Sequence, residues 1–193
     1  MFVLSTLSPD LTTAEVLRAK FAASGQLRPI DPTLEIAAVS AEVIGRTEDA
    51  LEAVALALLA LRADGSVGVG LANEVRSGVE LARQGAHDRK RSVRHVPLRV
   101  LGAVPSQNVD AAQAVLRLVG RIVVNRSQAE WRVLDELTPG VRGSQGPIAQ
   151  ALGISSQAVS KAIARAGWVE EWDGRRAAAL LLNAARQAVR DWS

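Results

Sequence analysis

Cysteine is absent from this chain of 193 residues. Disulfide bonds and thiolate metal sites are therefore excluded, and a cytoplasmic location is the natural expectation. The chain has only two histidines, His87 and His95, and neither has a partner carboxylate at metal-ligand spacing. The sequence also contains no Ser/His/Asp order and no HExxH helix. We therefore expect no metal, no cofactor and no enzyme activity.

Long hydrophobic runs are lacking as well. The longest apolar stretch, from Leu51 to Leu61, is interrupted by Glu52 and is too short to span a bilayer. The N-terminus shows no basic segment followed by an apolar run, so we expect no signal peptide. Apolar residues still make up 48% of the chain, which is enough for a hydrophobic core. The sequence therefore predicts a soluble protein without a membrane partner.

The chain carries little excess charge of either sign, with a net charge of +3. Residues 1–104 contain 12 Lys and Arg against 12 Asp and Glu, whereas residues 105–193 contain 11 against 8. The positive excess thus lies in the C-terminal half, which is the direction expected for phosphate binding.

The N-terminal half alternates between strand and helix patterns. A ferredoxin-like α/β sandwich is expected over residues 1–104, with helices covering one face of the sheet. Its expected strands are 1–6, 34–44, 66–71 and 96–101, and its expected helices are 12–23, 47–62 and 77–87. The segment Pro105-Ser106-Gln107-Asn108 marks the expected domain boundary, because strand signals disappear after it. The fold class predicted for the whole chain is α+β.

Residues 105–193 read as an all-helical domain built around a winged helix-turn-helix. Trp168 to Trp172, followed by Asp173-Gly174, predicts a short wing hairpin, because Asp-Gly favours a tight turn. Arg175 and Arg176 then lie where a wing approaches the DNA backbone. Residues 111–124 and 176–192 form helices that are apolar on more than one side. These two helices are the expected homodimer interface.

Residues 147–168 have the pattern of two short helices joined by a tight turn. Gly146 can cap the first helix, and Pro147 fits its first turn, where a missing N–H does no harm. Gly153 can take the positive φ with which a helix often ends. Ser155 can cap the second helix through its hydroxyl. This is the pattern of a helix-turn-helix, whose second helix reads the DNA major groove.

The second helix of this motif has an apolar face and a polar face. The expected apolar face consists of Ala158, Val159, Ala162, Ile163 and Ala166. The opposite face can meet base edges or phosphates, and no carboxylate occurs between Pro147 and Trp168 to repel phosphate. An ordinary αα-hairpin with a solvated polar face remains the alternative. The candidate DNA-binding residues are Ser155, Ser156, Gln157, Ser160, Lys161 and Arg165, together with Arg175 and Arg176 of the expected wing.

Two further patterns suggest anion binding. Gly68-Val69-Gly70 lacks the third glycine of a dinucleotide fingerprint and the Lys-Ser/Thr of a P-loop, so close packing of a helix on this strand is favoured. The most basic local patch can be a solvated loop or a site for phosphate or another anion. It consists of Arg89, Lys90, Arg91 and Arg94.

Taken together, these motifs resemble the SatD family. Residues 66–71, 77–83 and the basic cluster 88–91 look like the end of the degenerate nucleotide-cyclase-like domain of that family, and residues 152–161 and 166–168 are similar to its helix-turn-helix. The resemblance implies a sensory or scaffolding domain of ferredoxin-like fold attached to a winged helix-turn-helix of MarR-like type.

The chain departs from active nucleotide cyclases, which hold two metal ions with Asp residues. Ser5-Thr6 and Ser40-Ala41-Glu42 stand near the corresponding positions and leave one carboxylate, which cannot hold two Mg²⁺ ions. The sequence therefore predicts a transcriptional regulator that binds double-stranded DNA as a homodimer. The alternatives are a nucleotide- or anion-sensing module, and a protein-interaction module with a degenerate helix-turn-helix.

Overall fold

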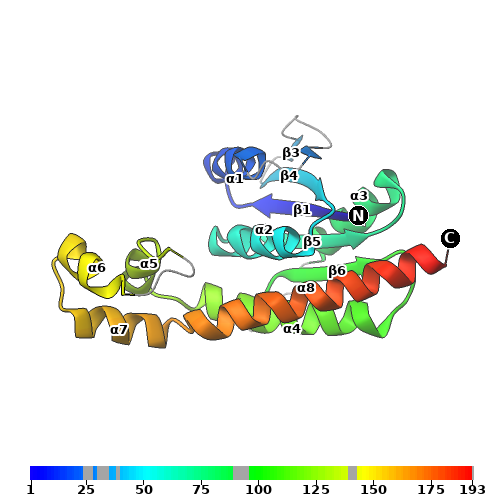
Figure 1. Cartoon of the computed structure of the whole chain (residues 1–193). Coiled ribbons are helices and arrows are strands. Elements are labelled where there is room, and N and C mark those ends of the chain that lie inside the picture. The colour runs from blue at the N-terminus through cyan, green and yellow to red at the C-terminus, as the bar shows by residue number, and fades with distance from the viewer. Residues whose placement is uncertain (24–27, 30–34, 38–39, 89–95, 139–142, 193) are drawn as a thin grey trace.

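The computed structural model describes residues 1–23, 28–29, 35–37, 40–88, 96–138 and 143–192. The fold is mixed α and β (Figure 1), as expected. The strands are β1 (Phe2–Ser8), β2 (Arg28–Pro29), β3 (Glu35–Ala37), β4 (Ser40–Thr47), β5 (Ser66–Leu71) and β6 (Leu98–Gly102). The helices are α1 (Leu11–Ala23), α2 (Ala50–Arg62), α3 (Val75–His87), α4 (Gln107–Val124), α5 (Gln128–Leu134), α6 (Gln145–Leu152), α7 (Ser156–Arg165) and α8 (Trp168–Asp191). The proposed anion patch at residues 89–94 and His95 lie outside the described residues.

The six strands form one mixed sheet in the order β2-β4-β1-β5-β6, with β3 also paired to β4. The central strand β1 is buried along its whole length and runs antiparallel to both β4 and β5. β5 and β6 are parallel neighbours joined through α3. A ferredoxin-like split βαβ unit instead places another strand between the two that its helix connects. The expected ferredoxin-like arrangement is therefore wrong in its strand order, although the α+β class is correct.

Helices cover both faces of this sheet. On one face, α3 packs against residues such as Val3 and Ile44. On the other face, α1, α2, α4 and α8 enclose the larger core, in which Phe2, Leu61 and Leu182 are almost completely buried. The free edge of β6 is covered by α4, whose Gln113 side chain accepts a hydrogen bond from the Val100 backbone N–H at 3.1 Å. Covering this edge prevents another strand from pairing with it.

The two glycines of β5 allow α3 to approach the sheet closely. A Cβ added at Gly68 would lie 1.8 Å from the carbonyl oxygen of Ala82, and one added at Gly70 would lie 2.2 Å from the carbonyl oxygen of Gly78. Ala82 and Gly78 both belong to α3. The glycine pair is thus explained by helix packing, which was the interpretation favoured over a phosphate loop.

The hydrophobic cores divide the chain differently from the expected boundary between residues 104 and 105. Buried residues of α4 and α8, including Leu116 and Leu182, belong to the same core as the sheet. A separate small core lies within α5, α6 and α7. Figure 1 shows these three helices at one end of the long antiparallel pair formed by α4 and α8. The helix-turn-helix unit is therefore an insertion between two helices of the main body.

The expected wing is wrong, because residues 168–191 form the single continuous helix α8. Gly167 takes the left-handed conformation (φ 60°) and begins the helix, and Glu170 and Glu171 in the first turn suit the positive end of the helix dipole. Gly174 is a packing residue rather than a turn residue, since a Cβ there would lie 2.3 Å from a methyl carbon of Val119 on α4. No helix in the described part of the chain combines the length and apolarity needed to cross a membrane.

We predict that Gly68→Ala destabilises the protein by about 3 kcal/mol or more, because the new methyl group overlaps the α3 backbone and the sheet or helix must move. The matched control is Gly146→Ala in α6, where an added Cβ meets nothing within 4 Å. The control should leave the free energy of unfolding unchanged or raise it slightly. Urea denaturation followed by circular dichroism measures both variants. Equal denaturation midpoints would contradict the packing role of Gly68.

Candidate nucleic-acid interface

The turn between α6 and α7 is built as the sequence predicts. Gly153 adopts the left-handed conformation, with φ 65° and ψ 34°. Its N–H donates to the carbonyl of Gln150, and the N–H of Ile154 donates to the carbonyl of Ala149, which is the Schellman pattern. Ser155 caps α7, since its hydroxyl oxygen accepts from the N–H of Ala158 at 3.2 Å. The two helices therefore meet at a fixed angle.

The first helix of the motif begins slightly earlier than expected. α6 starts at Gln145 with Ser144 as its N-cap, so Gly146 is not the cap. Pro147 still lies in the first turn, as expected, where its missing N–H leaves no acceptor without a partner. The earlier start of α6 concerns Gln145 and Gly146, and the turn at Gly153 and α7 are as the sequence predicts.

A third helix, α5, completes the unit. Ser127 caps α5 and forms a capping box with Glu130. The hydrogen bonds from Ser127, through its backbone N–H and its hydroxyl, hold the pKa of the Glu130 carboxyl below its ordinary value. The small core of the unit contains one buried side chain from α5 and two each from α6 and α7: Val133, Ile148, Ala149, Val159 and Ala162.

The outward face of α7 consists of polar side chains, as the sequence predicts. Ser155, Ser156, Gln157, Ser160, Lys161 and Arg165 are all exposed. No Asp or Glu occurs in α6, the turn or α7, so no carboxylate of these segments repels phosphate. Arg165 lies toward α5, with its Nε 3.9 Å from a carboxylate oxygen of Glu130. The surface thus combines hydrogen-bonding groups with two cations.

Two alanines of α7 belong to this surface and were not expected there. Ala158 was assigned to the apolar face, but it is exposed, and Ala164 is exposed as well. Ala164 follows Gln157 and Lys161 at helical spacings of seven and three residues, so its methyl group shares their face. An apolar methyl group on a DNA-reading helix is suited to contact the thymine methyl group.

Arg175 and Arg176 do not lie on a wing, so their expected role there is wrong. Both belong to α8, and each pairs with an acid of the same helix. The Arg175 Nε donates to Glu171 at 2.7 Å, and the Arg175 guanidinium lies over the Trp172 ring at 4.8 Å. Arg176 pairs with Asp173 at 2.7 Å on the exposed side of the helix. The candidate interface is therefore confined to α7 and the turn before it.

A buried ion pair holds the helix-turn-helix unit to the main body. Arg126, between α4 and α5, lies 2.6 Å from Glu171 of α8, and both side chains are 1% exposed. The Arg126 Nε also donates to the carbonyl oxygen of Ala166 at 2.8 Å, at the C-terminal end of α7. A positive charge at this end is favourable against the helix dipole. Arg126 thus connects the beginning of α5, the end of α7 and the beginning of α8.

Trp131 of α5 forms the second part of this joint. The guanidinium of Arg126 lies 4.7 Å from the Trp131 ring centroid, and that of Arg62, at the end of α2, lies 3.9 Å from it. Arg62 also donates two hydrogen bonds of 2.7 Å to the two carboxylate oxygens of Asp135. These bonds lower the pKa of Asp135 below its ordinary value. We refer to Arg62, Arg126, Trp131, Asp135 and Glu171 as the joint.

No pattern in the sequence indicates the joint, because its members are separated by up to 109 residues. The structure also accounts for Glu42, the single carboxylate near the resembled cyclase positions. Glu42 is buried and lies 3.0 Å from the Arg83 guanidinium and 2.5 Å from the Ser5 hydroxyl. Among the described residues, no group of three or more His, Asp or Glu side chains could hold a metal ion. Comparison with known proteins gives no matching family model, no curated relative and no solved structure with a significant match.

We predict that Glu171→Gln destabilises the protein by about 3–5 kcal/mol, because it leaves the buried Arg126 guanidinium without its carboxylate. The double variant Arg126→Met with Glu171→Leu should recover part of this loss, since neither charge is then buried. The matched control is Asp173→Asn, which removes the exposed ion pair with Arg176 on the same helix and should cost less than about 1 kcal/mol. Free energies of unfolding from chemical denaturation test the set. A loss no larger than that of the control would show that the pair is not structurally important.

Proposed function

We propose that this protein is a sequence-specific DNA-binding transcriptional regulator that reads double-stranded DNA through α7. The observation that carries the proposal is the exposed, carboxylate-free face of α7, which follows a left-handed glycine turn and a serine cap. A helix in this position of a three-helix unit enters the major groove with its N-terminal residues against the base edges. The same segment, residues 152–161, carries the resemblance to the SatD family, and membership of that family is part of the proposal. A regulator of this kind acts in the cytoplasm.

The side chains of α7 suit different parts of the duplex. Gln157 can form two hydrogen bonds with an adenine edge, and Lys161 can donate to a guanine edge or a phosphate. Ser155 and Ser156 lie at the N-terminal end of α7, where backbone N–H groups and the helix dipole favour a phosphate. Arg165, at the other end of α7 and 76% exposed, is suited to a second phosphate. No catalytic role is proposed for any residue.

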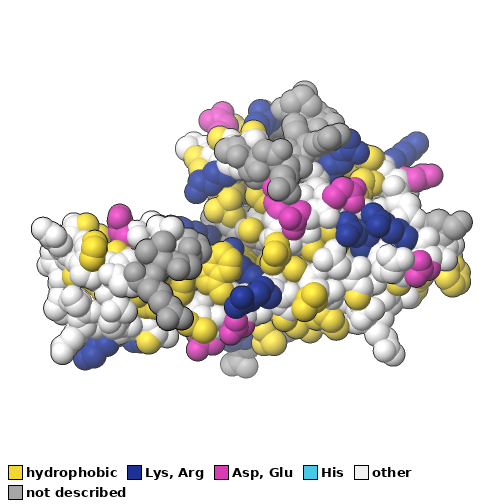
Figure 2. All heavy atoms as spheres, viewed as in Figure 1, with side chains coloured by type: hydrophobic (Ala, Val, Ile, Leu, Met, Phe, Trp, Pro, Cys, Tyr) yellow, Lys and Arg dark blue, Asp and Glu magenta, His cyan; other side chains and the backbone are white. Residues whose placement is uncertain are grey.

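The protein is further proposed to act as a homodimer through the outer faces of α4 and α8. These helices lie side by side in opposite directions (Figure 1), and each carries an apolar stripe with spacings of four, three and four residues. Hydrophobic side chains gather along this edge of the molecule in Figure 2. We call these residues the seam: Ala111, Val115, Leu118 and Ile122 on α4, and Ala177, Leu181, Ala184 and Ala188 on α8.

The seam is suited to a second copy of the same chain. The side chain of Leu118 is 67% exposed, and Leu180 beside the seam is 72% exposed, although both are large apolar residues. If the two α8 helices pack antiparallel, Ala177 of one copy faces Ala188 of the other, and their small side chains allow close approach. In this register Asp191 of the second copy lies near both Asp173 and Arg176, which are paired with each other within one helix.

We predict that Gln157→Ala and Lys161→Ala each weaken binding to a selected DNA site by about 1–3 kcal/mol if the residue reads a base, which is roughly 5- to 150-fold in affinity. The DNA is selected from a random oligonucleotide pool, and affinities are measured by fluorescence anisotropy at several salt concentrations. If Lys161 contacts a phosphate instead, its loss weakens all sequences equally and reduces the salt slope by about one. Matched controls are Gln84→Ala and Arg76→Ala on the exposed side of α3, which should change neither quantity. Weak, salt-sensitive binding that is the same for all five proteins would argue against the proposed role of α7.

We predict that Leu118→Glu converts a dimer into a monomer, because it places a charge in the apolar seam at a side chain that is 67% exposed. The matched control Leu51→Glu changes an exposed leucine of α2 away from the seam and should remain dimeric. Sedimentation velocity distinguishes the two states. Because the chain has no cysteine, the variant Val169→Cys can carry a spin label at this one position in each copy. The antiparallel arrangement places the two labels about 40 Å apart, at 1.5 Å per helical residue, and a monomer or a much shorter distance would contradict it.

A further inference from the structure

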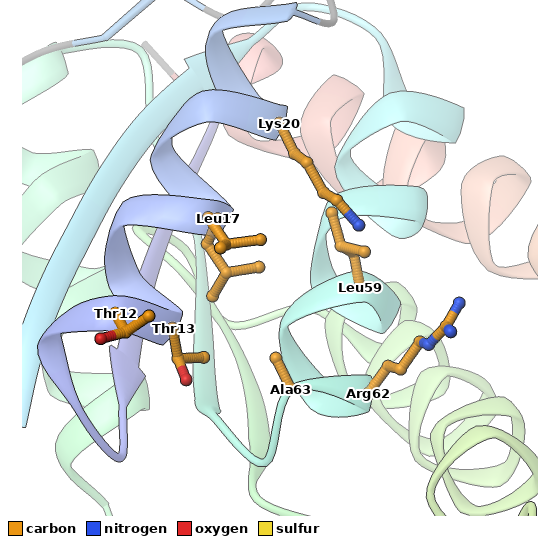
Figure 3. A pocket seen from close by; sticks show the side chains of 8 residues that line it. Thr12, Thr13, Leu17, Lys20, Leu59, Arg62 and Ala63 are labelled. Carbon is orange, nitrogen blue, oxygen red and sulfur yellow. The ribbon is translucent and has the colours of Figure 1, made fainter. Parts of the chain in front are cut away.

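A cavity of about 260 Å³ lies between α1 and α2, on the side of the main body next to the joint. Figure 3 shows Leu17 of α1 and Leu59 and Ala63 of α2 along its apolar wall, with the side chain of Lys20 extending from α1 toward α2. Thr12 and Thr13 lie at the end opposite Lys20. The volume is slightly below the usual range for drug-sized ligands, so the cavity fits a smaller molecule.

The charged groups that line this cavity are of one sign, and two carboxylates lie just beyond the lining, Asp135 bonded to Arg62 and Asp10 bonded to Thr13. Lys20 and Arg62 are its two charged lining residues, and no carboxylate lines it among the described residues. The positive charge of Lys20 also extends to the joint, since it contributes, after Arg62, to the lowered pKa of Asp135. An apolar wall with a cationic rim favours a small organic anion, whose apolar part lies against Leu17 and Leu59 and whose charged group meets Lys20.

Arg62 connects this cavity to the joint. Its aliphatic stem lines the cavity, while its guanidinium is directed away from α1 in Figure 3, toward α5. There it donates to both carboxylate oxygens of Asp135 and lies over Trp131. Arg62 and Asp135 are partly exposed, with side-chain exposures of 34% and 49%, so water and another anion can reach their ion pair.

We propose that the cavity binds a small organic anion, and that the Arg62 side chain turns from Asp135 toward the anion when the cavity is occupied. Loss of the Arg62–Asp135 contact removes one attachment of α5 to the main body, while the Arg126–Glu171 pair and the packing of Trp131 remain. The helix-turn-helix unit then changes its position or mobility relative to the body. The effect on DNA binding rests on the proposed function of α7, whereas binding of the anion does not.

The cavity and the DNA-binding face of α7 are coupled thermodynamically if both respond to the same equilibrium, between the intact and the broken Arg62–Asp135 contact. The anion then weakens DNA binding by the same factor by which DNA weakens anion binding. Because a partly exposed ion pair is the contact exchanged, the coupling lies at the low end of the usual range, at about fivefold. The fluorescence of Trp131 should report the loss of the stacked Arg62 even when no DNA is present.

The test uses the full chain with benzoate, hexanoate and phenyl phosphate as probes, and benzamide as the neutral counterpart of benzoate. Titration calorimetry and tryptophan fluorescence should show binding of at least one anion and at least tenfold weaker binding of benzamide. Benzoate or hexanoate binding without phenyl phosphate binding would identify the charged group as a carboxylate. If no anion binds more tightly than benzamide, the proposal is wrong.

Variants assign binding to the cavity. Lys20→Gln should weaken binding of the anion about tenfold, and Ala63→Phe should abolish it by filling the space between the helices. The matched control is Arg18→Gln, on α1 but outside the cavity lining, which should bind as the unchanged chain does. Circular dichroism and thermal unfolding confirm that each variant is folded. Equal effects of Lys20→Gln and Arg18→Gln would overturn the assignment.

The coupling has its own readout. Arg62→Gln should retain anion binding through Lys20 while losing both the fluorescence change and the fivefold effect on DNA affinity. Cavity-dependent anion binding without any DNA binding would mean that the proposed function has failed while the cavity site stands. DNA binding that is unaffected by a saturating anion would instead contradict the coupling and leave the function of α7 intact.

Discussion

The arrangement of the molecule depends on the buried contact between Arg126 and Glu171. Removing two charges from water is unfavourable unless their remaining hydrogen-bonding groups are satisfied. Here the Ala166 carbonyl accepts from the Arg126 Nε, and Arg175 is a second partner of the Glu171 carboxylate. The Arg126 guanidinium lies over the Trp131 ring, and its Nη1 has no hydrogen-bond partner among the described residues, so part of the cost of burial is not offset. Arg126 lies in the segment that enters the helix-turn-helix unit, and Glu171 lies in the helix that leaves it. The pair therefore fixes the position of the unit at the point where the chain enters and leaves it. Without it, the small core of α5, α6 and α7 would be joined to the body by Arg62, by the packing of Trp131 against the main core and by the covalent chain.

This contact also explains how a helical unit with a small core of its own is held in a defined position on the larger main body. The core of the helix-turn-helix unit contains five buried apolar residues, few compared with the core beneath the sheet. A core of that size contributes little stability on its own. The unit is held to α4 and α8 through Arg126 and through Trp131 of α5, so it shares the stability of the main body. The exposed face of α7 then keeps a defined orientation relative to the seam.

The features that the sequence predicted correctly are those with local causes. The conformation of Gly153, the cap at Ser155 and the outward face of α7 each follow from residues within one or two helical turns. The close packing on Gly68 was likewise visible in the residue type. Asp173-Gly174 shows the limit of such reasoning, because its local preference for a turn is overridden by the packing of Gly174 against Val119, which is 55 residues away in the sequence. Strand order and the joint depend on similarly distant pairs, so neither the sheet topology nor the role of Arg126 could be predicted.

The uninterrupted path of α8 sets a limit on how this protein can change in length. Glu171 and Gly174 fix the rotation of its first turns against Arg126 and Val119, and Ala185 and Val189 fix the rotation of its last turns against the main core. One residue added between these two sets would turn one set by about 100° relative to the other. Even a whole heptad, which nearly restores the rotation, would shift one set by about 10.5 Å along the axis. The segment between Gly174 and Ala185 therefore cannot gain or lose residues while both ends stay in place. Variation in length among proteins built on this plan should therefore fall outside this segment of α8.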